Sequence, residues 1–238
     1  MPVDFHCHIL PGVDDGSRDS HQSLQMLEAE ALQGITHVVA TPHFYANHTD
    51  PDKFLARRAQ AAEALAEAMQ GRSDLPRITL GAEVHYFAGI GESEQLQRLT
   101  IGSTKYILIE MPGPPWTEAG YRDLENIYLH QGLTPIIAHI DRYIGPWRTF
   151  GIPKRLEELP VLVQANGEFF LDKATAGMAM RMLRRGQIHL LGSDCHNLED
   201  RAPNLGEARQ RIAKKLGQPA LEWIGRFEAL LPEETTKV

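Results

Sequence analysis

The sequence predicts an α/β fold in which parallel strands, joined by helices, close into a (β/α) barrel. Short apolar runs alternate with longer amphipathic runs about seven times, and the connections between them are short. This alternation is typical of parallel strands joined by helical crossovers. Chemically active polar residues also follow nearly every apolar run, and in a barrel the carboxyl ends of the strands carry the function. That convergence favours a barrel over an open sheet.

Seven apolar runs are the predicted strands, and six amphipathic runs are the predicted helices. The strands cover residues 3–9, 36–41, 78–83, 106–110, 135–139, 161–165 and 188–192. The helices cover residues 20–33, 52–70, 119–131, 174–185, 204–216 and 220–230. In the first helix Leu24, Leu27 and Leu32 recur at helical spacing, and Gly34 follows where glycine commonly ends a helix. The sequence has no linker, repeat or low-complexity segment, so we expect one domain over residues 1–238.

Composition and charge disfavour several classes of protein. A formal net charge of -7 argues against a nucleic-acid surface, which would require a basic face. Only two cysteines occur, Cys7 and Cys195, so a disulfide-stapled secreted fold is not expected. No apolar run reaches the length of a membrane-spanning helix. Met1 leads directly into the first strand without room for a signal peptide, so we expect a cytoplasmic protein.

A histidine pair near the start of the chain is the most informative metal-binding signal. His6 and His8 lie one residue apart in a predicted strand, so their imidazoles point to the same side. Other imidazoles and carboxylates follow most of the later strands. In a barrel these groups would converge on one space, where buried charges are costly unless they are paired or bind a cation. The candidates at these positions are His6, His8, Asp15, His43, Glu83, Glu110, His139, Asp194 and His196.

The ligand types indicate the metal and the chemistry. Imidazole and carboxylate groups without clustered thiolates suit manganese, iron or zinc, whereas calcium prefers oxygen alone. The groups are too many for one ion and suit two or three ions that share a bridging carboxylate. Such a cluster binds a hydroxide between the metals and holds the oxygens of a transferring phosphoryl group. Arg142 and Arg201 follow His139 and His196 by three and five residues, and a guanidinium there would bind phosphate bidentately.

Several motifs resemble those of bacterial manganese-dependent tyrosine-protein phosphatases of capsule and exopolysaccharide operons, in the polymerase-and-histidinol-phosphatase superfamily. Two runs are specific: His6-Cys7-His8-Ile9-Leu10-Pro11-Gly12-Val13-Asp14-Asp15-Gly16 and Ser193-Asp194-Cys195-His196-Asn197-Leu198. Four shorter runs are similar to the family's other motifs: Ala40-Thr41-Pro42-His43, Gly81-Ala82-Glu83-Val84, Glu110-Met111-Pro112 and Gln164-Ala165-Asn166-Gly167. The resemblance extends from the first strand to Arg201.

The resemblance implies a distorted seven-stranded (β/α) barrel with three metal ions. The first ion would be held by His6, His8, Glu83 and Asp194. Glu83 would bridge to a second ion held by Glu110 and His139, and a third ion would be held by Asp15, His43 and His196. Arg142 and Arg201 would match the family's phosphate-binding arginines.

The resemblance also implies a substrate and a cofactor. The substrate would be phosphotyrosine in a protein, typically a membrane-associated tyrosine kinase that controls polysaccharide chain length. The metal would be manganese, with iron and zinc left open. The expected reaction is in-line attack of a metal-bound hydroxide on phosphorus, and tyrosine leaves as phenolate without a phosphoenzyme. Trp116, in the loop after the fourth strand, would either stack on the tyrosyl ring or pack within its loop.

The sequence departs from the family pattern at three points. Phe44 follows His43 where a second histidine is common, and Ile140-Asp141 stands before Arg142 where the family usually has Pro-Glu. Glu168 stands where a small hydroxyl residue is common. None of these changes removes a matched ligand, so they bear on substrate preference more than on chemistry.

The spacing of Cys195 and Arg201 also matches the C-x5-R signature of cysteine-dependent tyrosine phosphatases. That chemistry needs a thiolate beneath a loop of N–H groups, usually with a glycine that allows close approach. The residues between them contain no glycine, and Glu199 and Asp200 would repel a phosphate dianion. We therefore predict that Cys7 and Cys195 pack behind the barrel wall, each pointing away from the ligands beside it.

Three alternatives to a protein-tyrosine phosphatase stay open. A small-molecule phosphatase such as histidinol phosphatase would use the same metals in a smaller, closed pocket. A nuclease could use this metal chemistry, although the acidic charge disfavours it. A non-enzymatic regulator could keep the metals for structure, but the intact set of ligands with both arginines argues against it. The sequence leaves the oligomeric state open.

Overall fold

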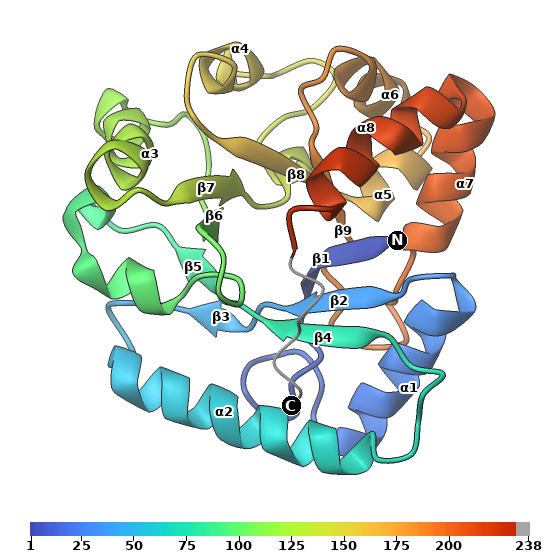
Figure 1. The fold of residues 1–238 in the computed structure, drawn as a ribbon. Helices are drawn as coiled ribbons and strands as arrows, with labels where there is room; N and C mark the ends of the chain where they lie inside the picture. Colours follow the sequence, from blue (N-terminus) through green and yellow to red (C-terminus); the bar gives the residue numbers. More distant parts are fainter. Residues whose placement is uncertain (232–238) are drawn as a thin grey trace.

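In the computed structural model, which describes residues 1–231, parallel strands lie at the centre and helices cover them from outside (Figure 1). The strands are β1 (Val3–Cys7), β2 (His37–Ala40), β3 (His43–Phe44), β4 (Arg77–Leu80), β5 (Glu83–His85), β6 (Tyr106–Glu110), β7 (Thr134–Ile137), β8 (Leu162–Asn166) and β9 (Leu190–Gly192). They pair in the orders β1-β2-β4 and β3-β5-β6-β7-β8-β9, and every pairing of these strands is parallel. The predicted α/β class with parallel strands is confirmed.

Two of the seven predicted strands are interrupted, which accounts for the larger number of strands in the described residues. The chain passes from β2 to β3 through Thr41 and Pro42, and from β4 to β5 through Gly81 and Ala82. Proline has no amide hydrogen to donate to a ladder, and glycine weakens a strand interior. A parallel bridge between Cys7 and Cys195 joins the segment of β1 to the segment that follows β9. With each interrupted strand counted once, the order is that of a distorted seven-stranded barrel.

Eight α-helices and three short 3-10 helices lie in the described part of the chain. The α-helices are α1 (Ser20–Leu32), α2 (Pro51–Ala68), α3 (Glu118–Gln131), α4 (Ile152–Leu156), α5 (Gly167–Leu171), α6 (Ala176–Arg184), α7 (Leu205–Leu216) and α8 (Gln218–Glu228). The 3-10 helices are η1 (Ile90–Glu92), η2 (Glu94–Arg98) and η3 (Ile140–Arg142). The six longer α-helices match the six predicted ones to within a few residues, whereas α4, α5 and the 3-10 helices were not predicted.

Local capping explains where the first helices begin and end. The Asp19 carboxylate accepts a hydrogen bond from the Gln22 amide at the start of α1, and Asp50 does the same for the first turn of α2. The Thr117 hydroxyl accepts from the amide of residue 120 at the start of α3. Gly132 ends α3 at a φ of 65°, which glycine adopts without steric cost. These caps fix the residues at which α1, α2 and α3 begin and the residue at which α3 ends.

Two apolar clusters fill the inside and the outside of the ring of strands. The inner cluster takes buried side chains from β1, β2, β6, β7 and β9, as the interior of a small barrel requires. Its members include Val3, Phe5, Val39, Leu108, Ile136 and Leu190. The larger outer cluster packs the strands against the helices. The apolar side chains therefore fill the barrel below the carboxyl ends of the strands, where the polar residues gather.

An irregularity in β1 decides which way its side chains face. The register between β1 and β2 shifts between Asp4 and Cys7. Phe5 belongs to the inner cluster and Cys7 to the outer one, although both would face the same side of an ideal strand. Cys7 therefore packs toward the helices, as predicted.

Two further predictions concern membrane spanning and domain organisation. No helix in the described residues is both long enough and apolar enough to cross a membrane. The predicted single domain over residues 1–238 extends into residues 232–238, which lie outside the described part, and it stays a prediction.

Candidate metal centre

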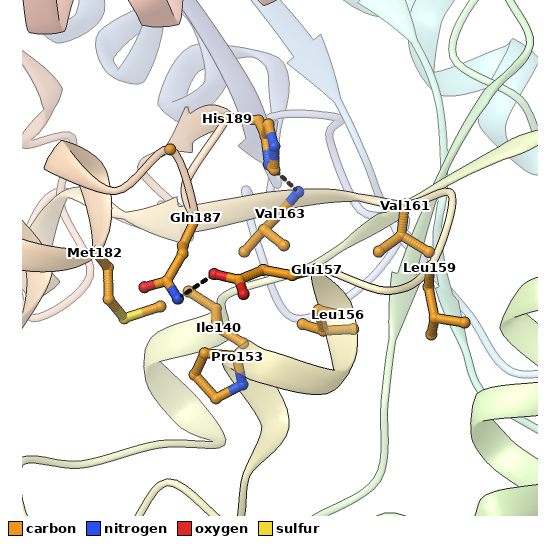
Figure 2. A pocket seen from close by; sticks show the side chains of 11 residues that line it. Ile140, Pro153, Leu156, Glu157, Leu159, Val161, Val163, Met182, Gln187 and His189 are labelled. Carbon is orange, nitrogen blue, oxygen red and sulfur yellow. Dashed lines mark hydrogen bonds between the residues drawn. The ribbon is translucent and has the colours of Figure 1, made fainter.

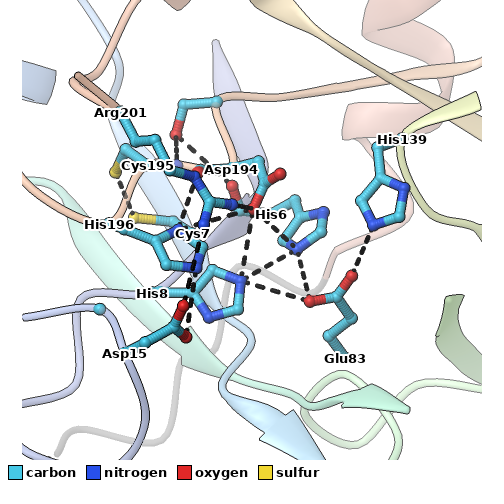
Figure 3. Close-up of polar contacts among 12 residues, drawn as sticks. His6, Cys7, His8, Asp15, Glu83, His139, Asp194, Cys195, His196 and Arg201 are labelled. Atoms are coloured by element: carbon cyan, nitrogen blue, oxygen red, sulfur yellow. Dashed lines mark hydrogen bonds and ion pairs between the residues drawn. The ribbon is translucent and has the colours of Figure 1, made fainter. Parts of the chain in front are cut away.

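Four candidate ligands meet at the ends of β1 and β9 and at the start of β5 (Figure 3). The Nε2 atoms of His6 and His8 lie 3.1 Å apart. Glu83 Oε2 lies 3.2 Å from His6 Nε2 and 3.4 Å from His8 Nε2. Asp194 Oδ1 lies 3.6 Å and 3.5 Å from the same two nitrogens. Ligand atoms that each lie about 2.1 Å from one cation are roughly 3 to 3.5 Å from one another, so this spacing suits a shared ion.

Glu83 extends this group toward β6 and β7. Its Oε1 lies 2.8 Å from His139 Nε2, which is in turn 3.6 Å from Glu110 Oε1. The two oxygens of Glu83 thus face two different sets of partners, as a carboxylate that bridges two ions would. Glu110 has a further neighbour that the sequence analysis did not single out, because His85 Nδ1 lies 2.9 Å from Glu110 Oε2.

A third group forms beside the loop after β1. The Nε2 atoms of His43 and His196 lie 3.4 Å and 3.5 Å from Asp15 Oδ1. The Asp15 side chain is 67% exposed, whereas those of the two histidines are 13% and 2% exposed. This side of the site therefore opens to solvent. The nine residues that the resemblance assigns to metals all lie in one connected set, called the ligand cluster below: His6, His8, Asp15, His43, Glu83, Glu110, His139, Asp194 and His196.

Neighbouring acceptors hold two of the histidines by their Nδ1 atoms. His8 Nδ1 lies 2.7 Å from Asp14 Oδ2, and His6 Nδ1 lies 3.3 Å from Gln164 Oε1. Asp14 also accepts from the His43 amide at 3.0 Å. An acceptor at Nδ1 leaves Nε2 free to face the cluster, which is the usual arrangement for a metal-bound histidine. Sequence reasoning did not assign these roles, although Asp14 stands in the opening motif.

Opposite charges determine the protonation of the inner ligands. Burial opposes a charge on His8, but the nearby carboxylates of Asp14 and Glu83 prevail and raise its pKa to about 10. Burial by itself would raise the pKa of Asp194, but His6 and His8 outweigh it and lower that pKa to about 2. The pKa of Glu83 also lies well below its ordinary value, because neighbouring histidines outweigh the effect of burial. The cluster thus stabilises positive charge between its carboxylates.

The outer imidazole of the cluster is kept neutral. Burial, His8 and Arg201 lower the pKa of His196 to about 4. Its Nδ1 lies 2.9 Å from the Asp194 carbonyl oxygen, and its buried Nε2 has no hydrogen-bond partner. Glu83 Oε2 is likewise buried without a hydrogen bond. Such atoms are costly to bury without partners, and divalent cations bound by imidazole and carboxylate would satisfy them. The residues present therefore fit a metal site.

Arg142 and Arg201 approach the cluster from two sides and meet at Asp194. Arg142 Nη2 donates to Asp194 Oδ2, and Arg201 Nη2 donates to Asp194 Oδ1 at 2.8 Å. Arg142 also lies 3.9 Å from Glu110, and Arg201 lies 4.0 Å from Asp15. Their side chains are 41% and 32% exposed, so both guanidinium groups reach solvent.

Backbone geometry at the site is unusual in ways that the sequence pattern does not predict. His139 has a φ of 30° and Asp194 a φ of 54°, a region that residues other than glycine seldom adopt. Such conformations cost roughly 1–3 kcal/mol each and cluster at functional sites. Close packing also requires glycine at one position, because a Cβ on Gly16 would lie 2.2 Å from the His8 carbonyl oxygen.

Trp116 packs within its loop. It is 8% exposed, its Nε1 donates to the Pro112 carbonyl at 2.8 Å, and its ring lies 4.9 Å from that of Tyr143. Of the two possibilities left open for Trp116, packing is therefore the one observed. Tyr45 stands at the edge of the cluster instead, 37% exposed, with its ring 5.5 Å from the His43 ring.

Both cysteines lie behind the ligand cluster, away from solvent. Cys7 and Cys195 are 0% exposed, and Figure 3 shows their sulfurs side by side. Burial raises the pKa of the Cys7 thiol well above its ordinary value. A nucleophilic thiolate needs access and a lowered pKa. The geometry therefore gives no support to the cysteine-dependent chemistry that the C-x5-R spacing would suggest.

A separate pocket of about 230 Å³ lies between α4, β8 and the segment after α6 (Figure 2). Apolar side chains such as Leu156, Val163 and Met182 form most of its wall, together with His189. The His189 Nδ1 accepts a hydrogen bond from the Val163 amide at 3.0 Å. None of the nine residues of the ligand cluster lines this pocket, so it is distinct from the candidate metal centre.

Comparison with known proteins gives matches over nearly the whole chain. Tyrosine-protein phosphatase YwqE of Bacillus subtilis is 33% identical over 226 residues, covering 90% of this chain and 85% of that protein. Tyrosine-protein phosphatase CpsB of Streptococcus pneumoniae is 30% identical over 226 residues, covering 90% of this chain and 91% of that protein. A solved structure from the work on YwqE and CpsB, described as unique metal-dependent tyrosine phosphatases, superimposes with a TM-score of 0.83. It covers 98% of this chain and 95% of that chain at 27% identity.

The predicted family relationship is confirmed by a match to a whole protein family. Residues 2–228 match the family described as capsular polysaccharide synthesis, CpsB/CapC. This range includes every residue of the ligand cluster and both arginines. The chain therefore belongs to the CpsB/CapC family.

Proposed function

We propose that this protein hydrolyses phosphotyrosine in a protein substrate with the help of two or three bound divalent cations. The observation that carries the proposal is the ligand cluster itself, in which nine imidazoles and carboxylates converge and two arginines reach the same edge. The relatives named tyrosine-protein phosphatases share the family of this chain and support the proposed reaction.

Three groups of residues would hold the cations. His6, His8, Glu83 and Asp194 would hold the first, and Glu83 with Glu110 and His139 would hold the second. Asp15, His43 and His196 would hold the third. Manganese, iron and zinc all suit such ligands, and we favour manganese. Bound cations would supply a hydroxide nucleophile at neutral pH and would stabilise charge on the phosphoryl oxygens.

Arg142 and Arg201 would bind the phosphate. Each guanidinium has five N–H donors and spends only some of them on Asp194 and its neighbours. The remaining donors can bind the oxygens of a phosphate that enters from the exposed side. Bidentate contacts of this kind fix the phosphorus atom and balance the charge that develops as the ester bond breaks.

The leaving group and the open side of the site favour a phosphotyrosine in a protein. A phenol has a pKa near 10, so tyrosinate departs with less help from a proton donor than an alkoxide would need. The exposed Asp15 and the half-exposed arginines leave the site open, whereas a small-molecule phosphatase would close around its substrate. Tyr45, at the edge, can contact the substrate ring.

The physiological substrate we propose is a membrane-associated tyrosine kinase that regulates capsular or exopolysaccharide synthesis. The family description places this chain among proteins of capsular polysaccharide synthesis, which supports that choice. Two free, buried cysteines suit a reducing compartment, so we propose that the reaction takes place in the cytoplasm.

The test compares substrates on one metal-loaded sample. Manganese-loaded protein should hydrolyse a phosphotyrosine peptide faster than the matching phosphoserine peptide or histidinol phosphate. A chelator should abolish turnover, and added manganese should restore it. Hydrolysis in oxygen-18 water should place label in the released phosphate in one step. Preferred turnover of histidinol phosphate would support the small-molecule alternative, and cleavage of single-stranded DNA would support a nuclease.

A further inference from the structure

We propose that Cys7 and Cys195 are a reversible disulfide site that ties the first strand of the barrel to the segment after the last. The Sγ atoms of these residues lie 3.0 Å apart, and both residues are 0% exposed. They are also the only two cysteines in the 238 residues of the chain. This proposal goes beyond the hydrolytic reaction, because it concerns a modification on the far side of the ligand cluster.

The backbone holds the two thiols in place. Cys7 and Cys195 form a parallel bridge, flanked by hydrogen bonds from the His8 amide to the Cys195 carbonyl at 3.0 Å and from the Asp194 amide to the His6 carbonyl at 2.7 Å. Neighbouring strands lie about 4.8 Å apart, which is within the range of Cα separations, roughly 4.4–6.8 Å, that disulfides span. The sulfurs need to approach by only about 1 Å to bond.

The surroundings of the thiols are polar rather than a simple apolar wall. Asp4, Glu30 and Ser193 line the same space, which we call the thiol cluster together with Cys7 and Cys195. Cys195 Sγ donates a long hydrogen bond of 4.0 Å to Glu30 Oε1, and the buried Glu30 Oε2 has no hydrogen-bond partner. The two thiols therefore lie beside two buried acids, Asp4 and Glu30, and not against a purely apolar wall.

The oxidation balances with hydrogen peroxide as the oxidant. When local opening exposes one thiol and it loses its proton, the thiolate takes one oxygen from peroxide and becomes a sulfenic acid, and the hydroxide that leaves takes up the proton to form one molecule of water. The second thiol then attacks that sulfur, the S–S bond forms, and the sulfenic oxygen leaves with two protons as a second water. Since both thiols are fully buried, the oxidant must be small and must enter when the site opens locally.

Closing the disulfide would disturb the ligand cluster. Cys7 stands between His6 and His8, and Cys195 stands between Asp194 and His196. Metal–ligand distances tolerate deviations of only about 0.2 Å, whereas the sulfurs must move by about 1 Å in total. We therefore expect oxidation to weaken cation binding and to lower turnover several-fold, and reduction to restore both. This consequence rests on the proposed function, but the formation of the disulfide does not.

The decisive experiment is the mass of the intact wild-type protein. Manganese-loaded protein is treated with hydrogen peroxide, and catalase then removes the excess. The protein is unfolded in urea that contains iodoacetamide, which alkylates any free thiol, and its intact mass is measured by mass spectrometry. We expect a monomer without alkyl groups that has lost two hydrogen atoms, and only a bond between Cys7 and Cys195 gives that mass. Alkylation of both thiols, oxygen added to either sulfur, or a disulfide-linked dimer in place of this species would overturn the proposal.

Two variants link the disulfide to activity and cation content. Cys7→Ser and Cys195→Ala should keep their activity in peroxide, while the wild type loses activity and recovers it with dithiothreitol. An equal, irreversible loss in wild type and variants would overturn the predicted effect on the ligand cluster. If a variant fails to fold, the wild-type mass and its reversal by dithiothreitol still decide the proposal. If the disulfide forms but no phosphatase activity is found, the proposed function fails and the disulfide site stands.

Discussion

Two buried polar clusters lie on opposite sides of the same two segments, and they treat their carboxylates in opposite ways. In the ligand cluster, the pKa values of Glu83 and Asp194 lie below their ordinary values. In the thiol cluster, the pKa values of Asp4 and Glu30 lie above theirs. Burial raises the pKa in all four cases, so burial cannot explain the difference.

The charged groups around each carboxylate explain why the pKa values shift in opposite directions. Histidines surround Glu83 and Asp194, and Arg142 and Arg201 donate to Asp194. Glu30 has instead Asp4 and Cys195 beside it, which would add negative charge. One side of the barrel wall is therefore built to hold positive charge, and the other side is built to hold protons. The comparison teaches that in this protein burial alone does not distinguish the two clusters, whereas the converging imidazoles and guanidinium groups do.

The largest expected effect comes from removing the charge of the bridging carboxylate. Glu83→Gln should lower turnover of a phosphotyrosine peptide by about a thousandfold or more, because it loses a charge that faces two sets of ligands. Elemental analysis of the variant should show fewer bound cations. Glu222→Gln, an exposed acid on α8, is the matched control and should match the wild type. Full turnover of Glu83→Gln would contradict the role of the ligand cluster.

The arginines should affect the reaction without emptying the cation sites. Arg201→Ala and Arg142→Ala should each lower kcat/KM on the order of a hundredfold, because each removes donors from the phosphate. Cation content should stay at the wild-type level. Arg184→Ala, at an exposed position of α6, serves as the control. An unchanged kcat/KM in both variants would show that the guanidinium groups only neutralise Asp194.

Asp14 should act through His8. Asp14→Asn replaces the carboxylate that holds His8 Nδ1 at 2.7 Å by a neutral amide. We expect apparent manganese affinity to fall by about 10- to 100-fold, with turnover largely recovered at saturating metal. Titration of activity with manganese separates the two effects. A lower kcat at saturation with unchanged affinity would assign Asp14 a different role.

Cation binding should also depend on pH. The pKa of His8 is about 10 without a cation, so a cation must displace a proton near neutral pH. The proton competes less as pH rises, so apparent affinity should increase by about tenfold per pH unit between pH 7 and 9 for each proton displaced. Calorimetric titration at several pH values measures this slope. An affinity that is flat or falls over this range would contradict the charge balance of the ligand cluster.

The smallest effect concerns the thiol cluster. Burial and Asp4 raise the pKa of Glu30 above its ordinary value of 4.5, so its protonated form favours folding. The contribution is complete below pH 4.5 and is lost as the pH rises toward the pKa that Glu30 has in the folded protein, at about 1.4 kcal/mol per pH unit. Glu30→Gln cannot lose a proton, so urea unfolding should show a flatter dependence of stability on pH than in wild type. Identical slopes would mean that Glu30 is charged in the folded protein.

Much of this arrangement could be predicted from the sequence, because periodicity and strand ends are local properties. The predicted strand over residues 106–110 coincides with β6, and the predicted ligands lie together because parallel strands bring their carboxyl ends to one edge. Contacts between distant segments could not be predicted. Gln164 on β8 reaches His6 on β1 and the amide of His139, which follows the neighbouring β7, and nothing near it in the sequence indicates those contacts.

Backbone conformation was also beyond the sequence pattern. The left-handed backbone of His139 and Asp194 is imposed by the surrounding structure against the local preference of those residues. Trp116 could rim the site or pack in its loop by pattern alone, and the Pro112 carbonyl that fixes it is a tertiary detail. The burial of the thiols was predictable from alternation, whereas their approach to 3.0 Å was not.

The most direct test of the account is elemental analysis and phosphotyrosine-peptide turnover on the same manganese-loaded sample. We predict two or three cations per chain, turnover that disappears when a chelator removes them, and recovery of both on adding manganese back. Less than one cation per chain together with turnover that a chelator does not change would contradict the central claim that the ligand cluster is a metal centre.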